Sequence, residues 1–585
     1  MSHILSHQER LQKLLKKGLK YQHEGRLRMA EEYYRKALKV DPLCTEARHR
    51  LSSLAGSAPP AHESLQALSD SLTEKPETLI NQANAYFAEG NIQSAIACLQ
   101  RVAVLRPDSA EAHFHLASAQ EQVGNFQAAA ESLRRAIELR PNSPDLHCHL
   151  ARVLCQTGAP ESAAELYQRA LILDPNRFDI YNDLGLVLTN LGNFGAAIEA
   201  FKRSLRLNPR CAKTIAGLGY LFEQKGDLIS AADAYRDAVK LDPQLAAAYV
   251  DLGFILFGLG EVVEAADCFH RLRALQPDSA EATANLGMIH LLQGDLATGW
   301  AEFEARWKVG VGEDRKLSQR PWKGEPLAGE RILLYAEQGF GDTLQFVRYV
   351  PLVAAQGGKV ILEVQPGLHR LLAGTEGAPQ VVSRGETLPE FTWQCSLLSL
   401  PLAFRTEFHT IPATVPYVSP DATQVQGWHQ RLEGNTRRIG LVWGGNPNMQ
   451  RDRLRSIPLE RLLPVLRVHG TTFYSLQVGA PSEQVKLLPP DVRLIDLAAE
   501  QKDFADTAAI IANLDLVISV DSSVAHLAGA MGKPVWVMLN KGCDWRWFLE
   551  REDSPWYPTA RLFRQTTAGD WPEVIMRIVQ ALEQG

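Results

Sequence analysis

The sequence lacks the cysteine spacings of a metal-binding or disulfide-stabilised protein. Its eight cysteines are scattered along the chain, and none of them belongs to a C-x-x-C pair. Zinc sites and the disulfide frameworks of small secreted domains depend on such close spacings. We therefore expect reduced thiols and a cytoplasmic protein.

Long apolar runs and an excess of charge are also missing. No apolar segment approaches the roughly 20 residues that span a bilayer, and the N-terminal MSHILSHQERLQKLLKKG is too charged for a signal peptide. The net charge of −6 gives no reason to expect nucleic acid or an anionic membrane as a partner. The length of 585 residues exceeds what one hydrophobic core organises, so we expect roughly two to four globular domains.

Two ligand-binding motifs are absent or incomplete. No D-x-D motif for a divalent metal occurs, so no metal cofactor is expected. The stretch YAEQGFGDTLQF (335–346) begins like a dinucleotide-binding loop, but Leu344 stands where the third glycine of G-x-G-x-x-G should be. A Rossmann dinucleotide site is therefore disfavoured.

What the sequence does have is an internal repeat of 34 residues. Prolines recur at 107, 141, 175, 209, 243 and 277, and loop glycines at 90, 124, 158, 192, 226, 260 and 294. Small residues recur at 83, 117, 151, 185, 219, 253 and 287, and again at 95, 129, 163, 197, 231, 265 and 299. An isolated upstream copy has Gly18, Gly25, Ala30, Ala37 and Pro42 in the same relative places. A period of this length indicates a stack of supersecondary units.

Each unit fits two amphipathic helices that are joined by the glycine turn, pack closely at the small residues and end at the proline. The segment YNDLGLVLTNLGNFGAAIEAFKRSLRLNP (181–209) resembles the tetratricopeptide repeat, and the resemblance covers about half the chain. We predict an N-terminal helical region with one such unit at 1–75, and an α-helical solenoid of about seven repeats at 76–313. A solenoid offers a concave face to a protein or peptide partner; a purely structural stack is the alternative.

The last unit departs from the others. GDLATGWAEFEARWK (294–308) places Trp300, Phe303 and Trp307 at helical spacing. We expect these rings to cap the solenoid and dock it on the next domain rather than to bind a ligand. The polar segment at 314–330 is predicted as a linker.

From Arg331 onward, short β-rich runs alternate with helical stretches. The runs are RILLY, KVILEV, RRIGLVW, TTFYSLQ, VRLIDL, DLVISV and KPVWVML. This alternation predicts doubly wound parallel sheets, in two Rossmann-like domains at 331–420 and 436–585. Two such sheets that face each other leave a cleft at the carboxyl ends of their strands, where ligands bind.

Three stretches could line that cleft. Asp342 lies at or near a helix start, where a helix cap is the simpler interpretation and catalysis the other. In DSSVAH (521–526) a buried strand runs into a helix start, which suits phosphate. In WGGNPNMQRDRLRSIPLERL (443–462) a loop with Arg451, Arg453 and Arg455 suits a diphosphate, because guanidinium groups match its oxygens; a solvated loop is the alternative.

Together these features resemble the GT-B glycosyltransferases, and most specifically the ADP-heptose:lipopolysaccharide heptosyltransferases of family nine. The "G-D" loop of that family corresponds to Gly341 and Asp342, and its D-[ST]-[GS]-x-x-H motif to DSSVAH. The resemblance covers about 330–585 and implies that Asp342 is the catalytic base. The site expected for the nucleotide sugar consists of Gly339, Gly341, Gly444, Gly445, Arg453, Arg455, Asp521, Ser522, Ser523 and His526.

The resemblance implies an inverting transfer without a metal, in which a nucleotide diphosphate sugar donates to an acceptor, here a protein recruited by the repeats. Two features depart from the family: the first α/β domain is short, and the tract NKGCDWRWFLEREDSPWYP (540–558) has no counterpart that we can map. Its tryptophans either cover the ligand or pack the C-terminal helix across the cleft. Two other hypotheses stay open, namely a scaffold with a degenerate transferase domain and a nucleotide-sugar sensor.

Overall fold

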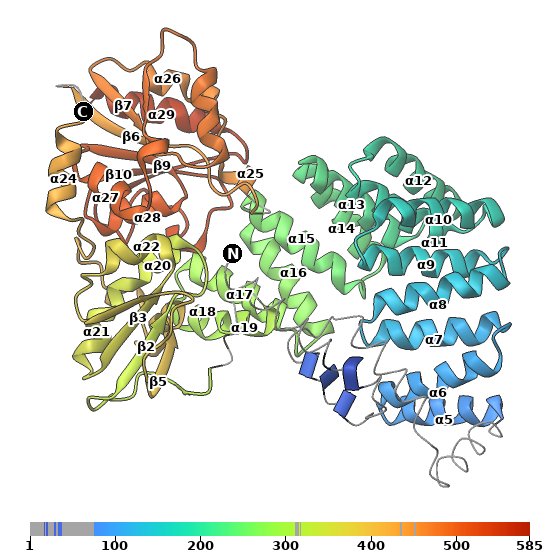
Figure 1. Cartoon of the computed structure of the whole chain (residues 1–585). Coiled ribbons are helices and arrows are strands. Elements are labelled where there is room, and N and C mark those ends of the chain that lie inside the picture. Colours follow the sequence, from blue (N-terminus) through green and yellow to red (C-terminus); the bar gives the residue numbers. More distant parts are fainter. Residues whose placement is uncertain are drawn as a thin grey trace. The chain divides into compact units, whose positions relative to one another are not determined.

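A computed structural model of the chain describes residues 75–310, 315, 317–432, 436–449 and 452–584, with scattered positions between 17 and 37. The region predicted at 1–75 lies largely outside these residues. In its repeat-like copy, Ala30 and Ala37 are helical and buried, whereas Gly18, Gly25 and Pro42 lie outside the described residues. The chain divides into two compact units, 1–173 and 174–585, and we describe each by itself (Figure 1).

The described part of the first unit consists of paired helices, drawn in blue and cyan in Figure 1. They are α5 (Pro76–Ala88), α6 (Ile92–Leu105), α7 (Ala110–Gln122), α8 (Phe126–Leu139), α9 (Pro144–Gln156) and α10 (Pro160–Leu173). The turns at Gly90, Gly124 and Gly158 have φ angles of 73°, 74° and 77°. Glycine is favoured there because other residues rarely adopt this left-handed conformation.

The second unit begins with further helices of the same repeat. They are α11 (Phe178–Asn190), α12 (Phe194–Leu207), α13 (Ala212–Lys225), α14 (Leu228–Leu241), α15 (Ala246–Leu259), α16 (Val262–Leu275), α17 (Ala280–Gln293), α18 (Leu296–Phe303) and α19 (Arg306–Val309). A Cβ atom on Gly185 would lie 2.6 Å from the ring of Phe201, and one on Gly253 would lie 2.7 Å from the ring of Phe269. The small residues therefore let paired helices approach closely, and the predicted helical solenoid is confirmed.

Two parallel sheets follow in the same unit. The first has the strand order β1-β5-β2-β3-β4, from β1 (Arg320–Pro321), β2 (Arg331–Tyr335), β3 (Lys359–Val364), β4 (Gln380–Ser383) and β5 (Trp393–Ser396). The short strand β1 belongs to the segment that the sequence predicts as a linker. The sheet is wound from β2 outward, first to β3 and β4 and then back to β5.

The second sheet has the order β11-β10-β9-β6-β7-β8. Its strands are β6 (Arg437–Val442), β7 (Thr471–Ser475), β8 (Leu494–Asp496), β9 (Leu516–Val520), β10 (Val535–Leu539) and β11 (Ala560–Arg564). The chain runs from β6 through β7 to β8, and then returns to β9 on the other side of β6. This reversal is a topological switch point, where α/β sheets bind ligands at the carboxyl ends of their strands.

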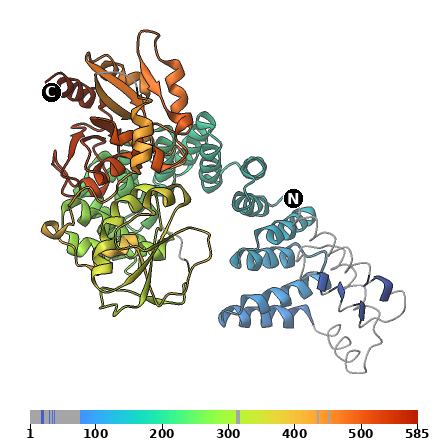
Figure 2. The same cartoon turned by 60° about the vertical axis from the view of Figure 1, so that its left-hand side comes forward.

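Helices connect or follow the strands of both sheets. The first sheet is drawn in yellow and the second in orange-red in Figures 1 and 2. The helices are α20 (Phe340–Phe346), α21 (Val350–Ala355), α22 (Pro366–Leu372), α23 (Leu400–Ala403), α24 (Ala422–His429), α25 (Asp452–Arg455), α26 (Leu463–Leu466), α27 (Phe504–Ala512), α28 (Ser523–Ala530) and α29 (Trp571–Gln584). Buried apolar residues of α29, among them Val574 and Ile578, pack on the second sheet.

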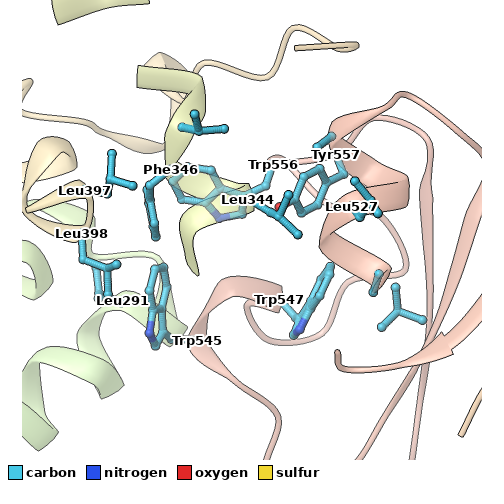
Figure 3. Close-up of a cluster of buried hydrophobic side chains, with 14 of the residues drawn as sticks. Leu291, Leu344, Phe346, Leu397, Leu398, Leu527, Trp545, Trp547, Trp556 and Tyr557 are labelled. Carbon is cyan, nitrogen blue, oxygen red and sulfur yellow. The ribbon is translucent and has the colours of Figure 1, made fainter. Parts of the chain in front are cut away.

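The tryptophan-rich tract at 540–558 packs the last repeat against α20 (Figure 3). The ring of Trp545 lies 5.2 Å from that of Trp300 in α18 and 6.3 Å from that of Phe346 in α20. Trp547 and Trp556 are fully buried. These rings pack inside the protein: Trp545 lies against the last repeat and α20, and Trp547 stacks on His526 of α28. The C-terminal helix, which the sequence interpretation named, packs on the second sheet instead.

Candidate functional site

A cavity of about 860 Å³ lies where the carboxyl ends of strands from both sheets meet. The loops after five strands line it: residues 337–342 after β2, 444–447 after β6, 476–481 after β7, 521–524 after β9, and Asp544 and Arg546 after β10. Ligand pockets commonly measure roughly 300–1,000 Å³. Of the residues predicted for the site, only Arg453 does not line this cavity.

Asp342 acts as a helix cap and forms an ion pair at the same time. It is the third residue of α20, and its Oδ2 accepts a hydrogen bond of 2.8 Å from the backbone N–H of Gly339. Its Oδ1 accepts a hydrogen bond from Nη2 of Arg546. Burial raises the pKa of the Asp342 carboxyl, and Arg546 offsets only part of this effect. Asp342 thus caps α20 from its third position, by bonding back to the N-cap residue Gly339, and its carboxylate also lines the cavity.

The stretch Asp521-Ser522-Ser523 leads from β9 into α28. The Oγ of Ser522 caps this helix by accepting a hydrogen bond of 3.3 Å from the N–H of Val524. Helix α28 lies against α20, and a Cβ atom on Gly341 would lie 2.9 Å from Cδ2 of His526. The glycine loop before Asp342 and the start of α28 therefore touch, although they follow strands of different sheets.

His526 is packed and neutral, yet it lines the cavity. Its Nδ1 lies 2.9 Å from the hydroxyl of Tyr557, and its ring stacks on Trp547 at 5.2 Å. Burial, with Arg546 nearby, lowers the pKa of His526 to about 3. Burial and the neighbouring Asp544 raise the pKa of Asp521 to about 6.

The glycines after β6 allow the arginine loop to pass close to the strand end. A Cβ atom on Gly445 would lie 2.1 Å from Oδ1 of Asp452, so a larger residue has no room there. The N–H of Gly444 donates to Oε1 of Gln477 at 2.8 Å. The Nε of Arg455, which lines the cavity, donates to Oδ1 of Asp452 at 3.0 Å.

Arg453 points elsewhere. Its Nη2 donates a hydrogen bond of 2.6 Å to the backbone carbonyl of Glu223 in α13. The structure thus places it at a contact between the arginine loop and the repeats rather than in the cavity. Arg451 lies outside the described residues.

Sequence reasoning missed Arg546 and Asp544. The Nη1 of Arg546 donates to Oδ1 of Asp544 at 2.8 Å, and its guanidinium lies 4.2 Å from the centre of the Trp545 ring. Although burial acts to raise it, the pKa of Asp544 lies below its usual range because of Arg546. The available signal was an Asp-x-Arg pair next to two tryptophans in CDWRW, because charged residues among large apolar rings are seldom buried unless they are paired.

The described residues contain no group of three or more histidine, cysteine, aspartate or glutamate side chains placed to hold a metal ion. The expectation of a reaction without a metal stays a prediction. None of the helices in the described ranges combines the length and the apolar character that crossing a membrane requires.

Comparisons with known sequence families agree with both halves of the molecule. Tetratricopeptide repeat models match residues 14–42, 82–153, 151–192, 182–246 and 222–289. The model of "Glycosyltransferase family 9 (heptosyltransferase)" matches residues 476–538, which run from the end of β7 through β10 and include DSSVAH. The chain thus carries multiple tetratricopeptide repeats, followed by a region similar to family 9 glycosyltransferases.

Individual proteins resemble parts of the chain. Protein FlbA of Caulobacter vibrioides (strain ATCC 19089 / CIP 103742 / CB 15) is 29% identical over 325 residues, 50% of this chain and 53% of that protein. The chain therefore spans about half the length of this curated relative. A solved tetratricopeptide repeat protein from Parabacteroides merdae ATCC 43184 is 19% identical, covers 41% of this chain and 94% of its own, and has a TM-score of 0.36. A crystal structure of MamA is 23% identical, covers 29% of this chain and 94% of its own, and has a TM-score of 0.27.

Proposed function

We propose that the chain is a glycosyltransferase of GT-B architecture, inverting and independent of metal, that transfers a sugar from a nucleotide diphosphate donor to an acceptor hydroxyl. The observation that carries this proposal is the meeting of Asp342 with the DSSVAH helix start in one cavity, although they follow strands of different sheets. The family 9 match supports it, because the matched residues contain that helix start.

Asp342 is the proposed base. In an inverting transfer the acceptor oxygen bonds to the anomeric carbon, and the bond from that carbon to the phosphate oxygen breaks on the opposite face. The hydroxyl proton passes to a carboxylate. Burial raises the pKa of Asp342, which makes it a better proton acceptor than an exposed aspartate.

The other wall of the cavity suits the leaving diphosphate. The start of α28 supplies the hydroxyls of Ser522 and Ser523 and the positive end of a helix dipole. Arg455 adds a guanidinium. Such groups stabilise charge that develops on the leaving group, as a metal ion does in other transferases. Gly339, Gly341, Gly444, Gly445, Asp521 and His526 complete the proposed site.

The proposed acceptor is a protein bound by the repeats. Tetratricopeptide solenoids present an extended concave surface, which suits a peptide or a protein partner. From the sequence we also propose a cytoplasmic location. Among the cysteines of the described residues, Cys268, Cys395 and Cys543 are buried thiols.

A panel of nucleotide sugars tests the proposal. Purified full-length protein is incubated with each donor, and thermal unfolding and release of nucleoside diphosphate are both measured. A cognate donor at 100 times its Kd adds about 2.7 kcal/mol to the free energy of unfolding. At least one donor should raise the melting temperature and release its diphosphate once acceptor is present. Stabilisation by no donor would contradict the proposal and favour the scaffold, whereas binding without turnover would favour the sensor.

A further inference from the structure

Arg546 pairs with Asp342 at the cavity, and it belongs to the 540–558 tract, for which the family resemblance offers no counterpart. Its side chain is 9% exposed and lines the cavity. Two carboxylates from different parts of the chain share its guanidinium: Asp544 bonds to Nη1 at 2.8 Å, and Asp342 bonds to Nη2.

One nitrogen of the guanidinium has no partner in the part of the chain that the structure describes. The buried Nε–H of Arg546 forms no hydrogen bond within these residues. Nε and Nη2 form the edge of a guanidinium that grips two oxygens of a phosphate or carboxylate side by side. In Arg177 and Arg370 of this chain, that same edge binds both oxygens of an aspartate. In Arg546 only the Nη2 half of the edge is taken, by a single oxygen of Asp342.

Asp342 does not fill this edge: its Oδ1 bonds to Nη2, and Nε has no partner among the described residues. Oδ2 accepts the N–H of Gly339 and caps α20. Asp544 lies at the Nη1 end, where it holds the guanidinium without blocking the edge. The ring of Trp545 supports the guanidinium at 4.2 Å. The guanidinium is therefore fixed in place with its Nε unpaired in the described part of the chain, and it lines a cavity that could hold a ligand with two adjacent oxygens.

We propose that Arg546 binds a phosphate of the donor on its Nε/Nη2 edge and releases Asp342 as it does so. Asp544 is then a positioning residue that keeps the guanidinium in place during the exchange. Donor binding frees the carboxylate that takes the acceptor proton, so the base is released only when a donor is present. This inference rests on the proposed donor site, and it assigns Arg546 a role in that site.

The exchange makes a prediction that a simple binding role does not. Because Asp342 competes with the phosphate for Arg546, Asp342→Asn should tighten nucleoside diphosphate binding about threefold or more, since a neutral amide is a weaker competitor. Arg546→Met should weaken binding about tenfold to hundredfold, the range for a lost charge-assisted hydrogen bond. In the double variant, Asp342→Asn should have no further effect.

Isothermal titration of the full-length variants with UDP, GDP, ADP, CDP and dTDP measures these affinities. Arg551→Met is the matched control, since Arg551 lies in the same tract and pairs with Asp553 but does not line the cavity. It should leave binding unchanged. If Arg546→Met fails to fold, Arg546→Lys takes its place, because lysine keeps the charge but has no such edge.

The outcomes separate this inference from the proposal beneath it. The exchange is supported if Asp342→Asn tightens diphosphate binding when Arg546 is present and has no such effect when Arg546 is replaced. Unchanged or weaker binding by Asp342→Asn overturns the exchange and leaves the donor site standing. If wild-type protein binds none of the five diphosphates, the donor site fails and the exchange fails with it.

Discussion

His526 is buried against the rings of Trp547 and Tyr557, so it stays neutral where an exposed histidine would take a proton. Its pKa is lowered to about 3, first by burial and then by Arg546. The unfolded chain binds the proton near pH 6.5. The unfolded state therefore holds more protons than the folded state between about pH 3 and 6.5, and the free energy of unfolding falls as the pH falls through this window.

Replacing His526 should remove that acid sensitivity. Between pH 7 and pH 5 the wild-type protein should lose about 2 kcal/mol more of its free energy of unfolding than His526→Asn does. The asparagine can keep a hydrogen bond to the hydroxyl of Tyr557. Denaturant unfolding at both pH values measures the difference between the two proteins. Asp521, whose pKa is raised to about 6, contributes in the opposite direction, but it does so in both proteins and so largely cancels. Equal pH dependence in the two proteins would show that His526 is protonated in the fold.

The sequence predicts those site residues that belong to a local pattern of strand, loop and helix. Asp521 directly follows β9, and Asp342 lies in the first turn of the helix that follows β2. This order of strand, loop and helix places both residues at the carboxyl edge of a sheet. Arg546 has no such pattern, because its place depends on the packing of Trp545 against Trp300 from the repeats. For Arg453 the prediction is wrong in another way. Its loop does border the cavity, but its side chain bonds to a backbone carbonyl of α13, and the sequence gives no sign that α13 lies beside this loop.

Helix α28 reaches its place only because small residues line it. A Cβ atom on Gly529 would lie 2.5 Å from Cδ1 of Tyr557, whose side chain is itself fully buried. The helix that carries Ser522, Ser523 and His526 is therefore held close to the aromatic tract, and its distance from α20 depends on this contact.

An added methyl group at this contact should be costly. We expect Gly529→Ala to lower the free energy of unfolding by about 1–3 kcal/mol, because a packed ring must move. Gly427→Ala in α24 is the matched control: nothing lies within 4 Å of its Cβ position, so better helix propensity should raise stability by about 0.5–1 kcal/mol. Denaturant unfolding of both variants checks the opposite signs. A stabilised Gly529→Ala variant would contradict the tight contact.

Among the elements, those with a continuous apolar pattern are predictable. All seven β-rich runs of the sequence form strands, from β2 to β10. Four strands are missed: β1, which has two residues, and β4, β5 and β11, because QVVS, WQCS and ARLFR are short and mix polar with apolar residues. Their pairing comes from neighbouring strands rather than from their own pattern. The repeats are the opposite case, since their period alone defines each helix pair.

Within the second unit, the last repeat contacts residues that line the cavity. The fully buried Arg306 of α19 donates from Nη2 to Oε1 of Glu337 at 2.8 Å and to the hydroxyl of Ser399 at 2.9 Å. Glu337 itself lines the cavity, and Nε1 of Trp300 donates to the carbonyl of Thr406 at 3.1 Å. The repeats of this unit thus support the first sheet directly, as the pattern of Trp300 and Phe303 predicts.

The central claim concerns the molecule as a whole, since the first sheet supplies the base and the second supplies the phosphate site. Asp342→Asn tests it most directly in the full-length protein, because the asparagine keeps an oxygen that can cap α20. Initial rates of sugar transfer and calorimetric donor affinity are measured on the same preparation. We predict a fall in rate of about 10²- to 10⁴-fold, the usual contribution of a general base, with donor binding no weaker than in the wild type. A variant that binds the donor and still transfers sugar at the wild-type rate would contradict the account.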